Sequence, residues 1–538
     1  MFHIYRGSQY ILAMLLTFLS VCPLVATTYY VDSMAGLDSN PGTSQGAPWQ
    51  TIAKVNGVSL NPGDSVLLAT GSVWHEQLTV TRSGSTSAPI TFGAYGSKQQ
   101  PILDGADQVS GWNLVSGNTY CAVFHGTAYK AYTDATYQQT GAVNRVASLD
   151  AVQATPGSLY SDGDYVYLHL SDESSPNDHT IEVSGARLYN ILATSQNHLV
   201  FSGLELIRAA RSGFLGNSTV DNSSGTFTNE YISLTGMTVF NWGNSFMDVG
   251  PDGGFAGIYG YGLSMSTQSP QRGWSVTKSY CGIGDVAPVL TYHVSCIDIE
   301  GTIAALIDHN TIASINSLGI SASAYYNGDP CSSPTISNND ISMSQGNIRV
   351  AGCPNAIVSH NTIHDSNGYG INLDGDEDAN HPEYSTNAHL LTNTITNLAP
   401  SHDGTLYNGI DCNKGSSGGT ADGNIIRQVS GNSLTLEGDT FVPNTSGQPC
   451  SGWTLSNNTL DASQNLTVTG GAPGRTGPVY IRDIAIQGLK LKNNTYILNT
   501  NYANGMTYGF TNAGDLSHDL TLAAFNAVAP NGGGGASH

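Results

Sequence analysis

The chain has 538 residues, of which 39% are hydrophobic and only 11% are charged, and its formal net charge is −22. Nine glutamates and seven lysines are too few for a mainly helical protein of this length, so helical bundles and helical solenoids are excluded. With 18 Lys and Arg against 40 Asp and Glu, the composition also argues against binding of nucleic acid through a basic surface.

The N-terminus is typical of a secretory signal peptide. Arg6 precedes the apolar run 11–21, and Leu24-Val25-Ala26 has the composition of a cleavage site. The apolar run is too short to span a bilayer. We therefore expect a signal peptide at residues 1–26 and an extracellular or periplasmic protein with no membrane contact after cleavage.

The domain organisation is predicted from changes in pattern along the chain. Four tyrosines between 120 and 137 mark a β-rich insertion that interrupts the early repeats. After the signal peptide we expect an N-terminal cap with the first coils at 27–110, the insertion at 111–184, further coils at 185–515, and a C-terminal cap with a flexible tail at 516–538.

Seven cysteines remain after cleavage at Ala26. Export makes disulfides available, and an odd number leaves at least one thiol unpaired. We expect the pairs Cys281 with Cys296 and Cys331 with Cys353. The cysteine spacings do not resemble those of a zinc site.

A six-residue pattern, apolar-x-x-Asn-x-apolar, recurs through the second half of the chain. The shortest spacing between its asparagines, from Asn339 to Asn361, matches one turn of a parallel β-solenoid, in which each coil buries its apolar face against its neighbours. One asparagine per coil predicts an internal ladder of stacked amides. The asparagines are Asn310, Asn339, Asn361, Asn393, Asn424, Asn458 and Asn494.

The N-terminal motifs carry a family resemblance. Tyr29-Tyr30-Val31-Asp32, Pro48-Trp49-Gln50-Thr51-Ile52 and Trp74-His75-Glu76, followed by the asparagine coils, resemble the secreted right-handed parallel β-helix proteins of the pectate-lyase-like superfamily. The resemblance implies an all-β, single-stranded right-handed parallel β-helix with an N-terminal cap, in which Trp49 and Ile52 belong to a capping helix. It also implies a carbohydrate polymer lying along the outer face. Because this fold hosts lyases, hydrolases, epimerases and tailspikes, the reaction must be argued from the site.

Solenoid strands alternate between core and solvent, and this alternation gives a register. Ile371 and Leu373 point inward, so Asn372 and Asp374 point outward, and the next coils align as Ile410 to Asn413 and Leu434 to Glu437. Extending this alignment backwards defines an outward polar strip of Asp298, Glu300, Arg349, Asn372, Asp374, Asp411, Asn413 and Glu437.

Three carboxylates in successive coils, Asp374, Asp411 and Glu437, are the predicted catalytic residues. Coils about 4.8 Å apart and outward positions about 6.8 Å apart separate Asp374 from Asp411 by on the order of 8 Å. Inverting glycosidases hold their carboxyls about 6.5–9.5 Å apart and retaining ones about 5–5.5 Å, so inversion is mildly favoured. Asp411 or Glu437 would act as the acid, and Asp374 or the other of that pair as the base.

The remaining site predictions concern substrate and metal. The predicted substrate-binding residues are Asp298, Glu300, Arg349, Asn372, Asn413, Lys414, Tyr325 and Trp242. We expect no required cofactor. A calcium site built from Asp374, Asp376 and Asp378 is retained as an alternative, although the EF-hand Gly and Glu are replaced by Ala379 and Ser385.

Three functions are compatible with the sequence. The first is a secreted glycoside hydrolase acting on a polysaccharide or oligosaccharide. The second is a calcium-assisted polysaccharide lyase that eliminates across a uronate, although the strip offers only Arg349 and Lys414 as cations. The third is a non-catalytic glycan-binding surface protein. In each case we expect a monomer without a nucleic-acid partner.

Overall fold

The computed structural model describes most of the chain between Ala26 and Leu520. The described segments are 26–134, 142–218, 229–240, 255–262, 271–282, 294–313, 315–324, 331–375, 384–400, 406–413, 415–436, 450–463, 479–481, 488–497, 508–509 and 519–520. Residues 1–25 of the predicted signal peptide and the end of the predicted tail lie outside these segments. Within them, no helix has both the length and the apolar character needed to cross a membrane.

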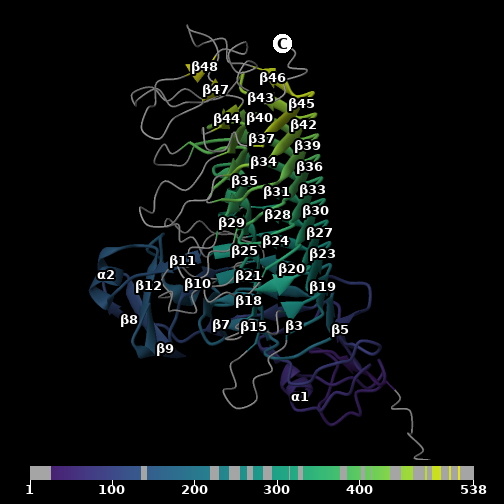
Figure 1. The fold of residues 1–538 in the computed structure, drawn as a ribbon. Helices are drawn as coiled ribbons and strands as arrows, with labels where there is room; N and C mark the ends of the chain where they lie inside the picture. The colour runs from purple at the N-terminus through teal and green to yellow at the C-terminus, as the bar shows by residue number, and fades with distance from the viewer. Residues whose placement is uncertain are drawn as a thin grey trace, which may run out of the picture.

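Three long sheets run along the molecule and form a stack of coils (Figure 1). The first sheet extends from β1 (Thr28–Val31) to β45 (Lys490–Lys492), and the second from β3 (Val73–Trp74) to β46 (Thr495–Ile497). Neighbouring strands in both are parallel, as far as the described segments extend. The predicted all-β parallel β-helix is therefore confirmed.

The third sheet, called the site sheet below, carries the predicted polar strip. Its strands are parallel except for the last pair, which is antiparallel. They are β4 (Leu78–Thr79), β15 (Tyr189–Leu192), β18 (Ser212–Ser218), β21 (Phe255–Gly262), β25 (Val294–Glu300), β29 (Ile315–Ser323), β32 (Ser344–Ala351), β35 (Tyr369–Asp374), β38 (Ile410–Cys412), β41 (Leu434–Leu436), β44 (Val479–Ile481), β47 (Tyr508–Gly509) and β48 (Asp519–Leu520).

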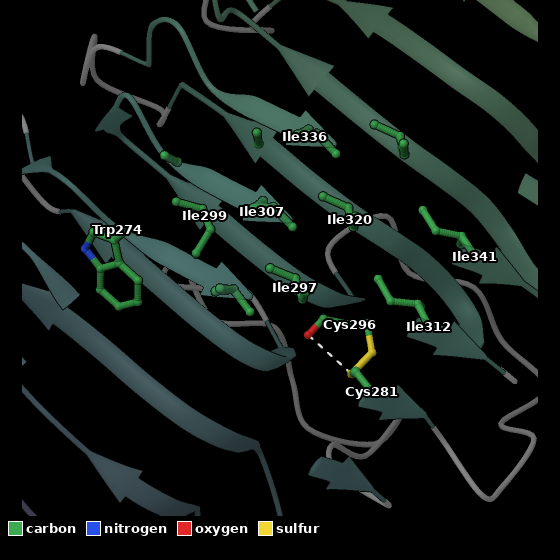
Figure 2. Close-up of a cluster of buried hydrophobic side chains, with 14 of the residues drawn as sticks. Trp274, Cys281, Cys296, Ile297, Ile299, Ile307, Ile312, Ile320, Ile336 and Ile341 are labelled. Carbon is green, nitrogen blue, oxygen red and sulfur yellow. Dashed lines mark hydrogen bonds between the residues drawn. A yellow bond between two sulfur atoms is a disulfide. The ribbon is translucent and has the colours of Figure 1, made fainter. Parts of the chain in front are cut away.

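Branched apolar side chains fill the interior of the coils. Figure 2 shows Ile297 and Ile299 of β25 among side chains that include Ile307 of the first sheet and Ile312 of the second. Each of these four isoleucines is at most 1% exposed. Since side chains on a strand alternate between its two faces, Asp298 between Ile297 and Ile299 is directed to the outside.

A ladder of asparagine amides runs inside the stack, as predicted. Except in Asn494, the last of the series, each Nδ2 donates to the Oδ1 of the asparagine in the next coil at 2.9–3.0 Å. Each also donates to a backbone carbonyl of a strand. The ladder comprises Asn310, Asn339, Asn361, Asn393, Asn424, Asn458 and Asn494, all buried.

Replacing Asn361 with alanine is expected to lower the free energy of unfolding by about 2–3 kcal/mol, because buried polar groups lose their partners. The Asn361 Oδ1 accepts from both the backbone N–H and Nδ2 of Asn339, and neither donor would have a substitute in the apolar core. Urea unfolding measures the loss. Asn113, whose exposed side chain donates to Gly111 O, gives the control Asn113→Ala, expected to change stability by less than about 0.5 kcal/mol. Equal losses in the two variants would contradict a special role for the ladder.

A short helix covers the N-terminal end of the stack. Helix α1 (Ile52–Asn56) begins after Thr51, whose side chain accepts from the backbone N–H of Lys54, and it buries Ile52 and Val55. Trp49 lies before the helix rather than in it, buried and stacked on Tyr29 at 4.6 Å between ring centroids. The expected capping helix is therefore present, but it does not include Trp49.

Both predicted disulfides are present, Cys281–Cys296 and Cys331–Cys353. A third, Cys412–Cys450, was not predicted. Cys121 is the free thiol among the described cysteines. The third disulfide joins Cys412 of β38, in the site sheet, to Cys450, which follows the segment 437–449.

A smaller sheet, separate from the three long ones, projects from the N-terminal part of the stack (Figure 1). It has its own apolar cluster, which includes Trp112, Phe124 and Leu168. In spatial order its strands are β7 (Ala106–Val109), β14 (Ile181–Ser184), β10 (Lys130–Thr133), β11 (Ala142–Arg145), β12 (Ser158–Ser161), β13 (Gly163–His169), β9 (Thr119–Gly126) and β8 (Asn113–Ser116).

A buried ion-pair network joins this projecting sheet to the coils. Arg208, which follows β17 (Glu205–Ile207), is 1% exposed and pairs with Asp104 and with Glu182 of β14. Its guanidinium also lies 5.1 Å from the ring centroid of Tyr132. Atoms of His75, Asp104 and Glu182 that could bind a metal ion lie within 4.8 Å of one another. However, the Arg208 guanidinium already donates hydrogen bonds to both carboxylates. We interpret this cluster as a structural joint and not as a metal site.

Candidate functional site

The outward residues of the site sheet lie in columns across successive coils. The predicted register is observed from β25 to β41, with Asn372 opposite Arg349 on one side and Asp411 on the other. One column contains Asp298, Ser321, Arg349, Asn372, Asp411 and Thr435. The neighbouring column contains Glu300, Ser323, Ala351 and Asp374, and Asn413 follows β38 at the next level.

Several predicted site residues lie outside the described segments. They are Glu437, Lys414, Tyr325, Trp242, Asp376 and Asp378. Their roles stay predictions. Strand β41 ends at Leu436, the residue before Glu437.

Two members of the polar strip are buried, although the sequence predicted that they are open to solvent. Asp298 is 2% exposed and Asn372 is 8% exposed. An outward direction does not ensure exposure, because side chains on adjacent coils are only about 4.8 Å apart and cover one another. Direct contact with a substrate would fall to the half-buried members, which include Glu300, Asp411 and Asn413.

An ion pair crosses between the two columns. The Arg349 guanidinium lies 3.4 Å from Asp374 Oδ2, with the two side chains 24% and 14% exposed. The backbone N–H of Gly375 donates to Asp374 Oδ1 at 3.0 Å. Each oxygen of the Asp374 carboxylate therefore faces a donor, and the pair fixes its orientation. Burial opposes the charge on Arg349, but Asp374, Tyr369 and Asp298 together raise the pKa of its guanidinium.

Asp298 carries a carboxyl with a strongly shifted pKa. Burial raises its pKa from 3.8 to about 6, against the opposing effects of Ser321, Arg349 and Ser295. Ser295 Oγ lies 3.4 Å from Asp298 Oδ2. A carboxyl with this pKa exchanges its proton within the range in which many acid–base groups of enzymes work.

Tyr369 is a member of the site that sequence reasoning missed. Burial raises the pKa of its phenol, and the charges of Arg349, Asp374 and Asp411 act on it. A Cβ at Gly346, its partner in β32, would lie 2.7 Å from a Tyr369 ring atom, so glycine there admits the ring. A glycine opposite a tyrosine in the aligned coils is the signal that identifies such a residue.

Asp374 and Asp411 form the described carboxylate pair. They lie one coil apart and in neighbouring columns, which corresponds to a Cα separation on the order of 8 Å. Asn413 Nδ2 donates to Asp411 Oδ2 at 3.3 Å. The two acids thus have different partners, a guanidinium for Asp374 and an amide for Asp411, as two different roles in proton transfer require.

The calcium alternative rests on one described residue, Asp374. Carboxylate oxygens are suitable calcium ligands. A cation bound at Asp374 would have to compete with Arg349, which already occupies Oδ2. The calcium site stays a prediction.

Comparison with known families agrees with the observed topology. The right-handed β-helix region family matches residues 274–460 of this chain. A solved structure of XylC in complex with xylose superposes with a TM-score of 0.53 at 13% identity, covering 87% of this chain and 83% of that one. The predicted right-handed parallel β-helix is therefore confirmed.

Similarity to lacto-N-biosidases was also found. A lacto-N-biosidase of Bifidobacterium longum subsp. longum is 47% identical over 83 residues, which is 14% of this chain and only 5% of that protein. The solved GH136 lacto-N-biosidase of Eubacterium ramulus gives a TM-score of 0.44 at 13% identity, covering 88% of this chain and 67% of that one.

Proposed function

We propose that this chain is an exported, monomeric glycoside hydrolase that cleaves a polysaccharide or oligosaccharide bound along the site sheet. The local similarity to a lacto-N-biosidase supports the broader assignment to carbohydrate-active enzymes. The observation that carries the hydrolase assignment is the placement of Asp374 and Asp411 on adjacent coils, at a separation compatible with an inverting pair.

The different partners of the two carboxylates suggest their roles. Asp374, paired with the Arg349 guanidinium, is suited to the charged role, the base that takes a proton from water. Asp411, or Glu437 one coil further on, would protonate the glycosidic oxygen. The bond from the anomeric carbon to that oxygen breaks as the bond to the water oxygen forms, so the proton count balances.

Product analysis tests the reaction class. Purified protein without its signal peptide would be incubated with a panel of glycans, with and without EDTA, while reducing ends and ultraviolet absorbance of unsaturated uronates are followed together. New reducing ends without absorbance, unaffected by EDTA, are the expected result. Reducing ends accompanied by absorbance would contradict hydrolysis. No product from any glycan would favour the non-catalytic alternative.

A polysaccharide lyase is the second candidate function, and Arg349 is the observation that favours it. Its guanidinium lies in the centre of the acidic strip, where it is suited to neutralise the carboxylate of a uronate. The pairing of Arg349 with Asp374 weighs against this role, because a uronate would have to displace a carboxylate that is already bound. EDTA-sensitive formation of unsaturated products would favour the lyase.

A further inference from the structure

Arg349 lies between two carboxyls of the site sheet. Asp374 is on the next coil and in the neighbouring column, whereas Asp298 is two coils away on the other side, in the column of Arg349 itself. Ser321 occupies the intervening position and is 2% exposed. Asp374 contacts the guanidinium in the structure, and the charge of Arg349 acts on Asp298 as well.

One oxygen of Asp298 accepts no hydrogen bond from the part of the chain that the structure describes. Ser295 and Ser321 hydrogen-bond to the carboxyl, but Oδ1 is buried and accepts no hydrogen bond from any described residue. The charged groups near it on the described strands are Arg349 and, two residues along β25 on the same face, Glu300, and its strand partner on β21 is the titratable residue Tyr259. A buried carboxylate oxygen is costly without a donor, and either a proton or the charge of Arg349 reduces this cost.

We infer that Asp298 is a positioning residue that competes with Asp374 for Arg349, so that the ion pair of the site depends on the protonation of a buried carboxyl. When Asp298 holds its proton it is neutral, and Arg349 pairs with Asp374 as observed. When Asp298 releases the proton to solvent, Arg349 faces two carboxylates and the hold on Asp374 weakens. The consequence for catalysis rests on the proposed function, whereas the coupling between Asp298 and Arg349 does not.

The sign of the effect on stability follows from the direction of the pKa shift. The pKa of Asp298 is raised from 3.8 to about 6 on folding, so the folded state binds this proton more tightly than the unfolded chain does. The resulting stabilisation is complete below about pH 4 and is lost as the pH rises through about 6. Asp298→Asn, which is neutral at every pH, is expected to be more thermostable than the native chain at neutral pH.

Thermal unfolding across this pH range tests the coupling without any substrate. The melting temperatures of the native chain and Asp298→Asn should diverge as the pH rises. In the Arg349→Gln background the divergence should still begin at about pH 4, but it should become larger and level off at higher pH, because the cation that lowers the pKa of Asp298 is gone. A divergence of unchanged size that levels off at the same pH would show that Asp298 does not interact with Arg349 and would overturn the inference.

Glu205→Gln is the matched control. Glu205 is 3% exposed, burial raises its pKa, and its Oε1 also accepts no hydrogen bond from a described residue, but it lies in the second sheet. Glu205→Gln should also stabilise the chain at neutral pH. It should alter neither the size of the divergence between the native chain and Asp298→Asn nor the pH at which that divergence levels off, and a change in either would contradict the assignment to Arg349.

The pH profile of kcat/KM tests the positioning role. The native enzyme and Glu205→Gln should both lose activity as the pH rises through about 6, and Asp298→Asn should lack this limb. Identical profiles in the three proteins would overturn the positioning role. If the native chain cleaves no glycan, the proposed function fails, while the unfolding experiment still decides whether Asp298 and Arg349 are coupled.

Discussion

Asp374→Asn is expected to reduce glycan hydrolysis by about 10²–10⁴-fold, the range for loss of a general acid or base. Asparagine keeps the shape of the side chain but cannot take a proton from water, and it removes the charge that pairs with Arg349. Asp411→Asn is expected to have a loss of similar size. Initial rates at saturating substrate, with circular dichroism to verify folding, measure both.

Asp340→Asn is the control for these variants. Asp340 lies on β31 (Asp340–Ser342) of the second sheet, is 56% exposed, and pairs with His364 at the surface. It should retain the native rate. If Asp374→Asn and Asp411→Asn also stay within about threefold of the native rate, neither residue is the acid or base, since such a change is only about 0.6 kcal/mol in activation free energy.

Arg208→Met is expected to destabilise the protein by about 3–5 kcal/mol. The substitution keeps much of the apolar volume but leaves the carboxylates of Asp104 and Glu182 without their cation, with side chains 0% and 14% exposed. Because these residues join the projecting sheet to the coils, the loss should also appear as early proteolysis at this joint. Calorimetry and limited proteolysis measure the two effects.

Arg187→Met tests whether the burial of an ion pair determines how much stability its loss costs. Arg187 pairs with Asp107 at 2.5 Å close to the same joint, but the Asp107 side chain is 39% exposed. Partly exposed pairs contribute about 1 kcal/mol or less, because water replaces the lost partner. A loss for Arg208→Met no larger than that for Arg187→Met would mean that the buried network does not hold the joint.

The stacked coils were predictable because two periodic signals agree. The asparagine of each coil sits between fixed apolar positions, and the alternation of Ile371 and Leu373 with polar residues sets the register of the site sheet. A slip of one residue would bury the polar set and expose the apolar one. The pattern therefore specifies the alignment even though the segments between asparagines vary in length.

Features that depend on how deeply a side chain is buried were less predictable from the sequence. Alternation places Asp298 on the outer face, but it does not show that neighbouring side chains bury it. The two cysteines of the Cys412–Cys450 disulfide are 38 residues apart in the sequence, whereas those of the other two disulfides are 15 and 22 residues apart. The inward alignment of Cys412 with Leu373 was the available signal, but nothing in the local pattern identifies its partner.

The asparagine ladder makes the coil the natural unit of evolutionary change in this chain. Each ladder asparagine from Asn339 through Asn361 to Asn393 joins its coil to the neighbouring coil. Duplicating a whole coil would add one level to the outer face and leave the other contacts intact. A single-residue insertion within a strand such as β35 would instead reverse the direction of the side chains beyond it. Homologues should therefore differ in length mainly by complete coils or by segments between strands.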